Sequence, residues 1–333
     1  MQKKTAVLGS GAWGTALANM LQARGESDVT LWSRNKEKAA ELKEGYASSL
    51  GGLALSKGLR IETDAKEALR DSDAVVCVVV SFGLREFLAK ARAFWPREAL
   101  VVNACKGLEE STGKRMSELF MEELPWMDKS QLAQLSGPNL AGEIALGKPA
   151  STVIASPSIE TAEFFQRMFH SDTFRAYASN DLAGVELGGA IKNVIAIAAG
   201  ICHGLELGDN CVAALATRGI REISRLGEKL GAKPETFAGL AGFGDVLVTC
   251  VSPQSRNRSL GEAIGRGGDP RELLAQRSSV EGAHTVKALK ALAQQTSTAL
   301  PVSDIVYRVL FEGFPAKDAG AVLMEREPQH EMN

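Results

Sequence analysis

Three glycines close to the N-terminus constrain this chain more than any other feature of it. An apolar run that ends at Leu8 breaks into Gly9, Gly11 and Gly14, and apolar residues with helical spacing follow. In such a G-x-G-x-x-G turn the first glycine allows a tight turn off the strand, the second lets the backbone approach a pyrophosphate, and the third lets the helix pack closely on the sheet. The pattern predicts a dinucleotide-binding unit; the alternative is a merely tight strand-to-helix turn.

Composition places the chain among ordinary globular proteins. It has 333 residues, enough for two domains, of which 45% are hydrophobic, and its formal net charge is −2. A charge this close to zero lacks the broad basic surface that non-specific nucleic-acid binding needs, so we expect no nucleic-acid partner. No apolar stretch reaches the roughly 18 residues of a membrane span. Five scattered cysteines, mostly in apolar runs, are typical of buried thiols, and we therefore expect a soluble, cytoplasmic protein.

Strand-like and helix-like segments alternate in the first half of the chain, whereas helical patterns dominate beyond about Tyr177. The alternation predicts an α/β fold with a parallel, doubly wound sheet of Rossmann type, which binds ligands at the carboxyl ends of its strands. We predict a dinucleotide-binding domain over residues 1–178 and an all-α substrate-binding domain over residues 179–333. The strand-like runs after the first cover residues 28–32, 74–80, 99–104 and 131–135, and the longest helical patterns cover 185–201 and 213–230.

The residues after the second strand bear on the choice of dinucleotide. An NAD-preferring site carries an acid about 20 residues beyond the glycines, where it binds the ribose hydroxyls. Here Ser33 and Arg34 stand at that place, and no carboxylate comes before Glu37. Because an arginine can accommodate a 2′-phosphate, we expect NADPH to be preferred over NADH. The alternative is a solvated arginine on a loop.

Lys192 is the foremost candidate for a chemical role. It is the only charged residue from Leu187 to Ala199, a helical run that is otherwise apolar and rich in small residues. Burial lowers the pKa of an ammonium group, which can then act as an acid or base near neutral pH. Gly188 and Ala196, one turn to either side, would leave room for a ligand on that face. The alternative is a snorkelling or structurally paired lysine.

Further polar residues cluster after strand ends and at helix starts. Lys106 stands just past a strand, where the alternative is a solvated lysine. Asp245 opens a short apolar helix, with Thr249 one turn later on the same face, although an N-cap also explains Asp245. The run 254–258 is dense in guanidinium and amide donors that suit a phosphate dianion, and Arg258 also fits an exposed charge.

The histidines do not suggest chemistry. None of the four has the spacing of a metal site or a visible nucleophile nearby. We therefore expect neither metal catalysis nor Ser/Cys–His catalysis, and no bound metal. These residues are His170, His203, His284 and His330.

Together these clusters resemble the NAD(P)-dependent glycerol-3-phosphate dehydrogenase family of bacteria, and the resemblance runs from Lys4 to about Leu323. The most specific segment is 189–200, which is similar to that family's signature at every constrained position. Segments similar to the family's other motifs stand, in the same order, at 106–109, 136–147, 242–245, 255–258 and 280–282.

The resemblance implies reduction of dihydroxyacetone phosphate to sn-glycerol 3-phosphate with NADPH or NADH, feeding glycerophospholipid synthesis. It implies that Lys192 is the general acid–base residue, that Asp245 orients or tunes it, and that Lys106 polarises the substrate. The implied substrate contacts are Lys106, Gly137, Asn139, Lys192, Asp245, Thr249, Ser255, Arg256 and Asn257. The implied cofactor contacts are Gly9, Gly11, Ala12, Trp13, Gly14, Arg34, Lys106, Ala141, Arg256, Ser279 and Glu281. A homodimer is a hypothesis, because the sequence does not give the oligomeric state.

Two departures from the family concern loops of the first domain. Val80 replaces a proline that is common before Ser81, and the segment 46–56 lacks the family's proline-bearing loop. Asn139 stands where Ser or Thr is common, which keeps a polar side chain there. These departures bear on loop geometry more than on the chemistry.

Two other functions remain as alternatives. β-Hydroxyacid dehydrogenases resemble one another in a G-x-x-x-K-x-x-x-N helix, but Ala196 stands at the Asn position here. That difference and the cluster 255–257 favour a phosphate ester over a carboxylate substrate. A redox-sensing binding protein, which would bind the dinucleotide without chemistry, has no reason to keep Lys106, Lys192 and Asp245 together.

Overall fold

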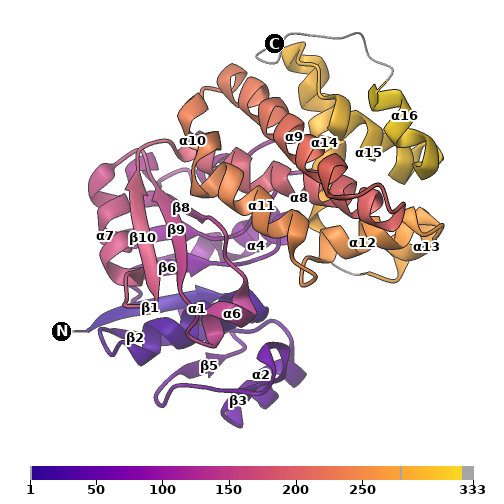
Figure 1. Ribbon diagram of the computed structural model, residues 1–333. Helices are drawn as coiled ribbons and strands as arrows, with labels where there is room; N and C mark the ends of the chain where they lie inside the picture. The colour runs from indigo at the N-terminus through magenta and orange to yellow at the C-terminus, as the bar shows by residue number, and fades with distance from the viewer. Residues whose placement is uncertain (1, 278–279, 325–333) are drawn as a thin grey trace.

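The computed structural model describes residues 2–277 and 280–324, with an α/β half followed by a helical half (Figure 1). An eight-stranded sheet forms the centre of the first half. Every neighbouring pair of its strands is parallel except β8 and β9, which are antiparallel. The spatial order is β10 (Phe174–Ser179), β9 (Ala150–Ala155), β8 (Leu132–Ser136), β7 (Leu100–Asn103), β6 (Ala74–Cys77), β1 (Lys3–Leu8), β2 (Ser27–Trp32) and β5 (Arg60–Glu62).

Helices cover both faces of this sheet, as a doubly wound fold requires. On one face α1 and α7 bury leucines and phenylalanines such as Leu17 and Phe165, and on the other α4 and α5 bury Leu88 and Phe120. Buried on both faces, the central strands are continuous apolar runs rather than alternating ones. The helices of this half are α1 (Ala12–Ala23), α2 (Lys36–Lys43), α3 (Ala65–Leu69), α4 (Ser81–Ala91), α5 (Met116–Glu123), α6 (Ala141–Ala145) and α7 (Ile159–Phe169).

The predicted sheet is confirmed in type but differs in detail. The strands β5, β9 and β10 were not expected, and β9 breaks the all-parallel order. The strand expected over 74–80 ends at Cys77. The chain there crosses over the glycine turn, since a Cβ atom on Gly9 would lie 2.7 Å from the carbonyl oxygen of Val78. In the segment 46–56 the chain forms a small hairpin of β3 (Tyr46–Ala47) and β4 (Leu53–Ala54).

One long helix, α8 (Leu182–Gly204), forms the centre of the second half. Every residue from Gly184 to Cys202 is buried, which explains why apolar residues predominate on all sides of the helix. Contrary to the expectation that no apolar stretch is long enough, α8 could cross a membrane by length and composition, but its apolar stretch is buried inside the protein. Glycines let α12 approach it closely, because a Cβ atom on Gly261 would lie 2.0 Å from the carbonyl oxygen of Ile197. The helix is therefore the core about which the other helices pack.

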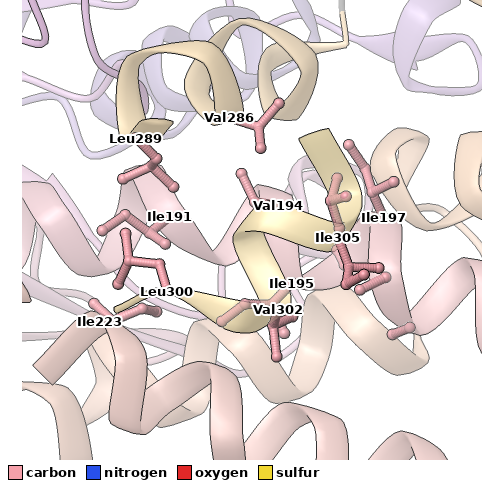
Figure 2. Packing of buried hydrophobic residues seen from close by; sticks show 14 of the residues in the cluster. Ile191, Val194, Ile195, Ile197, Ile223, Val286, Leu289, Leu300, Val302 and Ile305 are labelled. Carbon is pink, nitrogen blue, oxygen red and sulfur yellow. The ribbon is translucent and has the colours of Figure 1, made fainter. Parts of the chain in front are cut away.

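Branched aliphatic side chains fill the space around α8. Ile191, Val194 and Ile195 of α8 lie among side chains from α9, α14 and α15 (Figure 2). The predicted boundary at residue 178 falls one residue before the end of β10 and stays a prediction. The helices of this half are α9 (Asp209–Lys229), α10 (Pro234–Ala238), α11 (Asp245–Val251), α12 (Arg256–Gly265), α13 (Pro270–Ala275), α14 (Glu281–Thr296), α15 (Pro301–Phe311) and α16 (Ala319–Met324).

Candidate active site

Three charged side chains from distant parts of the chain meet where the two halves join. Lys192 lies in the middle of α8, Lys106 follows β7, and Asp245 is the first residue of α11. Each lysine ammonium donates to its own oxygen of the Asp245 carboxylate, Lys192 to Oδ1 and Lys106 to Oδ2. The carboxylate is fully buried and both lysine side chains are nearly so. Two ammonium groups on one carboxylate leave a surplus positive charge, which suits an anionic ligand or an oxygen that gains negative charge.

The helix α11 presents a second polar group to Lys192. The Nζ atom of Lys192 donates to the Oγ1 atom of Thr249 at 2.9 Å, and Thr249 lies one turn after Asp245. A turn of π-helix, η4 (Leu240–Gly244), precedes α11 and continues into it, so Asp245 does not cap the helix. The N-cap interpretation of Asp245 is therefore wrong, because its carboxylate is engaged by the two lysines.

The room expected beside Lys192 is partly taken up by protein. A Cβ atom on Gly188 would lie 2.4 Å from the carbonyl oxygen of Ala241. Gly188 therefore serves to let the π-helical turn pack against α8, and it does not open space for a ligand. This close contact sets the distance between α8 and α11, and with it the meeting of Lys192 and Asp245.

Lys106 has an unusual electrostatic setting. Its Nζ atom also donates to the carbonyl oxygen of Gly137 at 3.0 Å. Burial lowers the pKa of Lys106 to about 8; the charge of Asp245 opposes this shift and the charge of Lys192 adds to it. The ammonium form therefore predominates at neutral pH but is lost in mildly alkaline solution.

A chain of amides lies next to Lys192 and joins three helices. The Nδ2 atom of Asn257 donates to Oδ1 of Asn193 at 2.9 Å, and the N–H of Gly282 donates to Oδ1 of Asn257 at 3.1 Å. Asn193 in turn donates to Glu281 at 3.3 Å. Burial raises the pKa of Glu281, although the positive charges of nearby Arg256, Lys192 and Lys106 lower it in part. Asn193 is absent from the residues expected above, although a polar side chain directly after Lys192 in so apolar a helix is itself a signal.

The residues expected to hold a phosphate gather at the start of α12. Ser255 caps the helix, its Oγ atom accepting the N–H of Arg258 at 3.2 Å. Arg256, the first helical residue, is exposed, whereas the Arg258 side chain is only 15% exposed and lies 3.4 Å from Glu262. Arg258 is therefore not the exposed charge that the alternative interpretation supposed.

Asn139 directs its side chain toward the sheet. Its Nδ2 atom donates to the carbonyl oxygen of Ser151 at 3.0 Å, and its Oδ1 atom accepts from Oγ1 of Thr152 at 2.9 Å. Both partners belong to β9. These contacts shape the loop that carries Gly137, and they engage both polar atoms of Asn139.

The glycine turn has the shape that a pyrophosphate requires. Gly9 has a φ of +119°, and a Cβ atom on Gly14 would lie 1.9 Å from the carbonyl oxygen of Gly9. A Cβ atom on Gly11 would meet nothing within 4 Å, so this face of the turn is open. Half-buried Ala12 and Trp13 begin α1 beside it. The turn therefore fits the pyrophosphate of a dinucleotide, held by the N–H groups that begin α1.

The remaining cofactor residues surround this turn. Arg34 is exposed directly after β2, and the hydroxyl of the preceding Ser33 accepts from Ser10 of the turn at 2.6 Å. Ala141 begins α6, which packs against α1, while Ser279 lies outside the described residues. Within the part of the chain that the structure describes, no group of three His, Cys, Asp or Glu side chains could hold a metal ion.

Comparison with known proteins agrees with this arrangement. Family models of the NAD-dependent glycerol-3-phosphate dehydrogenase N-terminus and C-terminus match residues 4–162 and 181–321. The chain belongs to this family. A glycerol-3-phosphate dehydrogenase [NAD(P)+] of Chlorobium phaeobacteroides is 43% identical over 99% of both chains. The crystal structure of glycerol-3-phosphate dehydrogenase from Coxiella burnetii superposes with a TM-score of 0.92 at 35% identity, covering 98% of this chain and 99% of that one.

As a member of the family, the chain brings some predicted site residues into direct contact and leaves others apart. Lys106, Lys192, Asp245 and Thr249 form one hydrogen-bonded cluster, and the carbonyl group of Gly137 joins it. In a second group, Asn193 is hydrogen-bonded to both Asn257 and Glu281, and Asn193 directly follows Lys192 in the chain. The glycine turn and Arg34 lie in the sheet half, at the carboxyl ends of β1 and β2.

Proposed function

We propose that this protein reduces dihydroxyacetone phosphate to sn-glycerol 3-phosphate, with NADPH or NADH as the reductant. The observation that carries the proposal is the convergence of Lys106 and Lys192 on the buried Asp245 carboxylate. The full-length relatives named glycerol-3-phosphate dehydrogenase [NAD(P)+] support it. The product is the alcohol from which glycerophospholipids are built, so we assign the enzyme to that biosynthesis.

In this proposal Lys192 is the proton donor. The hydride comes from the reduced nicotinamide ring when the cofactor is bound. As the C2 carbonyl of the substrate becomes an alkoxide, the ammonium of Lys192 donates a proton to that oxygen. Asp245 and Thr249 hold the Nζ atom in place, and Lys106 polarises the carbonyl. Charge that grows on the oxygen is stabilised most by cations already in position.

The phosphate and the cofactor would be held at the edges of this cluster. The guanidinium of Arg256 and the start of α12, with Ser255 and Asn257, provide donors for the phosphate dianion. Gly9, Gly11 and Gly14 would hold the pyrophosphate of the cofactor. Other expected cofactor contacts are Ala12, Trp13, Arg34, Lys106, Ala141, Arg256, Ser279 and Glu281.

Three broader assignments belong to the same proposal. The dinucleotide domain would cover residues 1–178 and the substrate domain 179–333. All five cysteines are free, which favours a reducing, cytoplasmic location. We carry a homodimer forward as the oligomeric hypothesis, to be tested by measuring the mass of the protein in solution.

An assay with dihydroxyacetone phosphate and each reduced cofactor tests the function. We expect cofactor oxidation that depends on the substrate and requires its phosphate group. Tight NADPH binding without any oxidation would instead favour a redox-sensing binding protein. Faster oxidation with a β-keto acid than with dihydroxyacetone phosphate would favour a hydroxyacid dehydrogenase.

A further inference from the structure

Two buried amides lie side by side in the middle of the sheet. Asn103 is the last residue of β7, and Gln134 is its direct partner on β8. Both side chains are almost completely buried, at 1% and 2% exposure. Most strand residues around them are apolar, and an apolar side chain of similar size, such as Met, could occupy the space of Gln134. A buried amide that lacks a hydrogen bond costs about 1–3 kcal/mol, so the pair calls for a physical reason.

The hydrogen bonds of these amides converge on the backbone of one residue, Cys105. The carbonyl oxygen of Cys105 accepts from Nδ2 of Asn103 at 3.1 Å and from Nε2 of Gln134 at 3.0 Å. The N–H of Cys105 donates to Oδ1 of Asn103 at 3.3 Å, and the two amides are joined to each other at 2.6 Å. Both lone pairs of the carbonyl are thus used, and Cys105 is held on its two sides.

Cys105 immediately precedes Lys106, so its orientation sets the direction in which the lysine leaves the sheet. The ammonium of Lys106 must reach Asp245 on α11 and the carbonyl group of Gly137, which follows β8. Gln134 lies on that same strand, three residues before Gly137. One amide therefore fixes both the loop that carries Lys106 and the strand that leads to its hydrogen-bond acceptor.

We propose that Gln134, with Asn103, is a positioning residue that holds the Cys105 peptide so that the ammonium of Lys106 points at the reacting carbonyl. Gln134 touches neither Lys106 nor Asp245 and acts only through the backbone. The proposal deepens the proposed function, because it rests on the assignment of Lys106 as the group that polarises the substrate.

The variant Gln134→Met removes both polar atoms of the Gln134 amide at nearly constant volume. Misplacement of a catalytic group by about 1 Å can cost about 100-fold in rate, so we expect kcat/KM for dihydroxyacetone phosphate to fall about 10- to 100-fold. Gln166→Met is the matched control, since Gln166 bonds the carbonyl oxygen of Ala176 at 3.0 Å, and we expect it to change kcat/KM little.

A double-mutant cycle separates positioning from a general loss of structure. In a Lys106→Ala background, Gln134→Met should cause no further loss of kcat/KM, because the residue it positions is gone. An equal loss in both backgrounds would overturn the proposal. If Gln134→Met fails to fold, Gln134→Asn keeps the amide but shortens its reach by one methylene, and the same cycle applies.

A second readout does not depend on catalysis. The pH dependence of acetylation at Lys106, followed by peptide mass spectrometry, should give a midpoint near the pKa of about 8 in the wild type. Besides Asp245, this lysine faces the charges of Lys192 and Glu281. Burial dominates, so a loosened loop should raise the midpoint by about one unit or more in Gln134→Met.

The two readouts separate the possible failures. An unchanged midpoint would contradict positioning by Gln134, whatever the enzyme turns over. A wild-type protein that does not reduce dihydroxyacetone phosphate, yet whose Lys106 midpoint moves in Gln134→Met, would overturn the proposed function and keep the positioning.

Discussion

The Nζ atom of Lys192 lies 2.9 Å from the Oγ1 atom of Thr249, within the same cluster of hydrogen bonds as Asp245. The two residues come from α8 and α11, whose separation is set by close packing at Gly188. Lys192 is thus held on two sides by groups of one helix. Its position depends on packing at a site where no chemistry occurs.

Replacing Lys192 by Ala should lower kcat by about 100- to 10,000-fold, the usual cost of losing a proton-transfer group. The measurement is turnover of dihydroxyacetone phosphate at saturating cofactor. NADPH affinity, measured by fluorescence titration, should stay close to that of the wild type. Turnover near the wild-type rate, with cofactor binding intact, would remove Lys192 from the mechanism.

Replacing Arg256 by Ala should mainly weaken use of the phosphorylated substrate. A charge-assisted hydrogen bond contributes about 1.5–3 kcal/mol, so kcat/KM should fall about 10- to 100-fold. Use of unphosphorylated dihydroxyacetone, which lacks the group that Arg256 would bind, should be affected much less. Arg266→Ala, at the exposed far end of the same helix, is the control. Equal use of both ketones by the wild type would place the phosphate site elsewhere.

Replacing Arg34 by Ala should reduce the preference for NADPH. The guanidinium would contact only the 2′-phosphate, so kcat/KM with NADPH should fall about 10-fold while that with NADH changes little. Parallel assays with the two cofactors give this ratio directly. Equal losses with both cofactors would show that Arg34 does not read the 2′-phosphate.

Glu222 predicts a pH dependence of stability in the helical half. Its carboxylate accepts the N–H groups of Val302 at 2.6 Å and Ser303 at 3.3 Å, at the start of α15. Burial outweighs these bonds and raises the pKa of Glu222 from 4.5 to about 7. The folded protein therefore binds this proton more tightly than the unfolded chain does. The contribution of this raised pKa to the free energy of unfolding is fully present below about pH 4.5. It is lost as the pH rises through about 7.

A thermal unfolding series of Glu222→Gln tests this prediction. The shift corresponds to at most about 3 kcal/mol, so the variant should gain stability relative to the wild type between about pH 5 and about pH 8. Glu228 is an exposed residue of α9, the helix that also carries Glu222, and Glu228→Gln should show no such trend. A constant difference between Glu222→Gln and the wild type across that range would contradict the raised pKa.

Much of the fold could be predicted from local patterns. The glycine turn, the strand–helix alternation and the long helix around Lys192 each depend on neighbours a few residues apart, so their periodicity is visible in the chain. The strands β5, β9 and β10 were missed, because their strand conformation depends on pairing with distant segments. The strand expected over 74–80 was too long, because the three valines after Cys77 could equally have continued it.

The site shows the same division between local sequence and tertiary structure. The sequence alone determined which residue types are exceptional where they stand, namely Gly9, Gly11 and Gly14 in a strand-to-helix turn and Lys192 in an apolar helix. Only the tertiary structure decided that Lys106 and Lys192 share the one carboxylate of Asp245, and that Gln134 fixes the peptide before Lys106. The physical reason is that hydrogen bonds and charges act over a few ångströms in space, whereas these residues lie tens of positions apart in the chain.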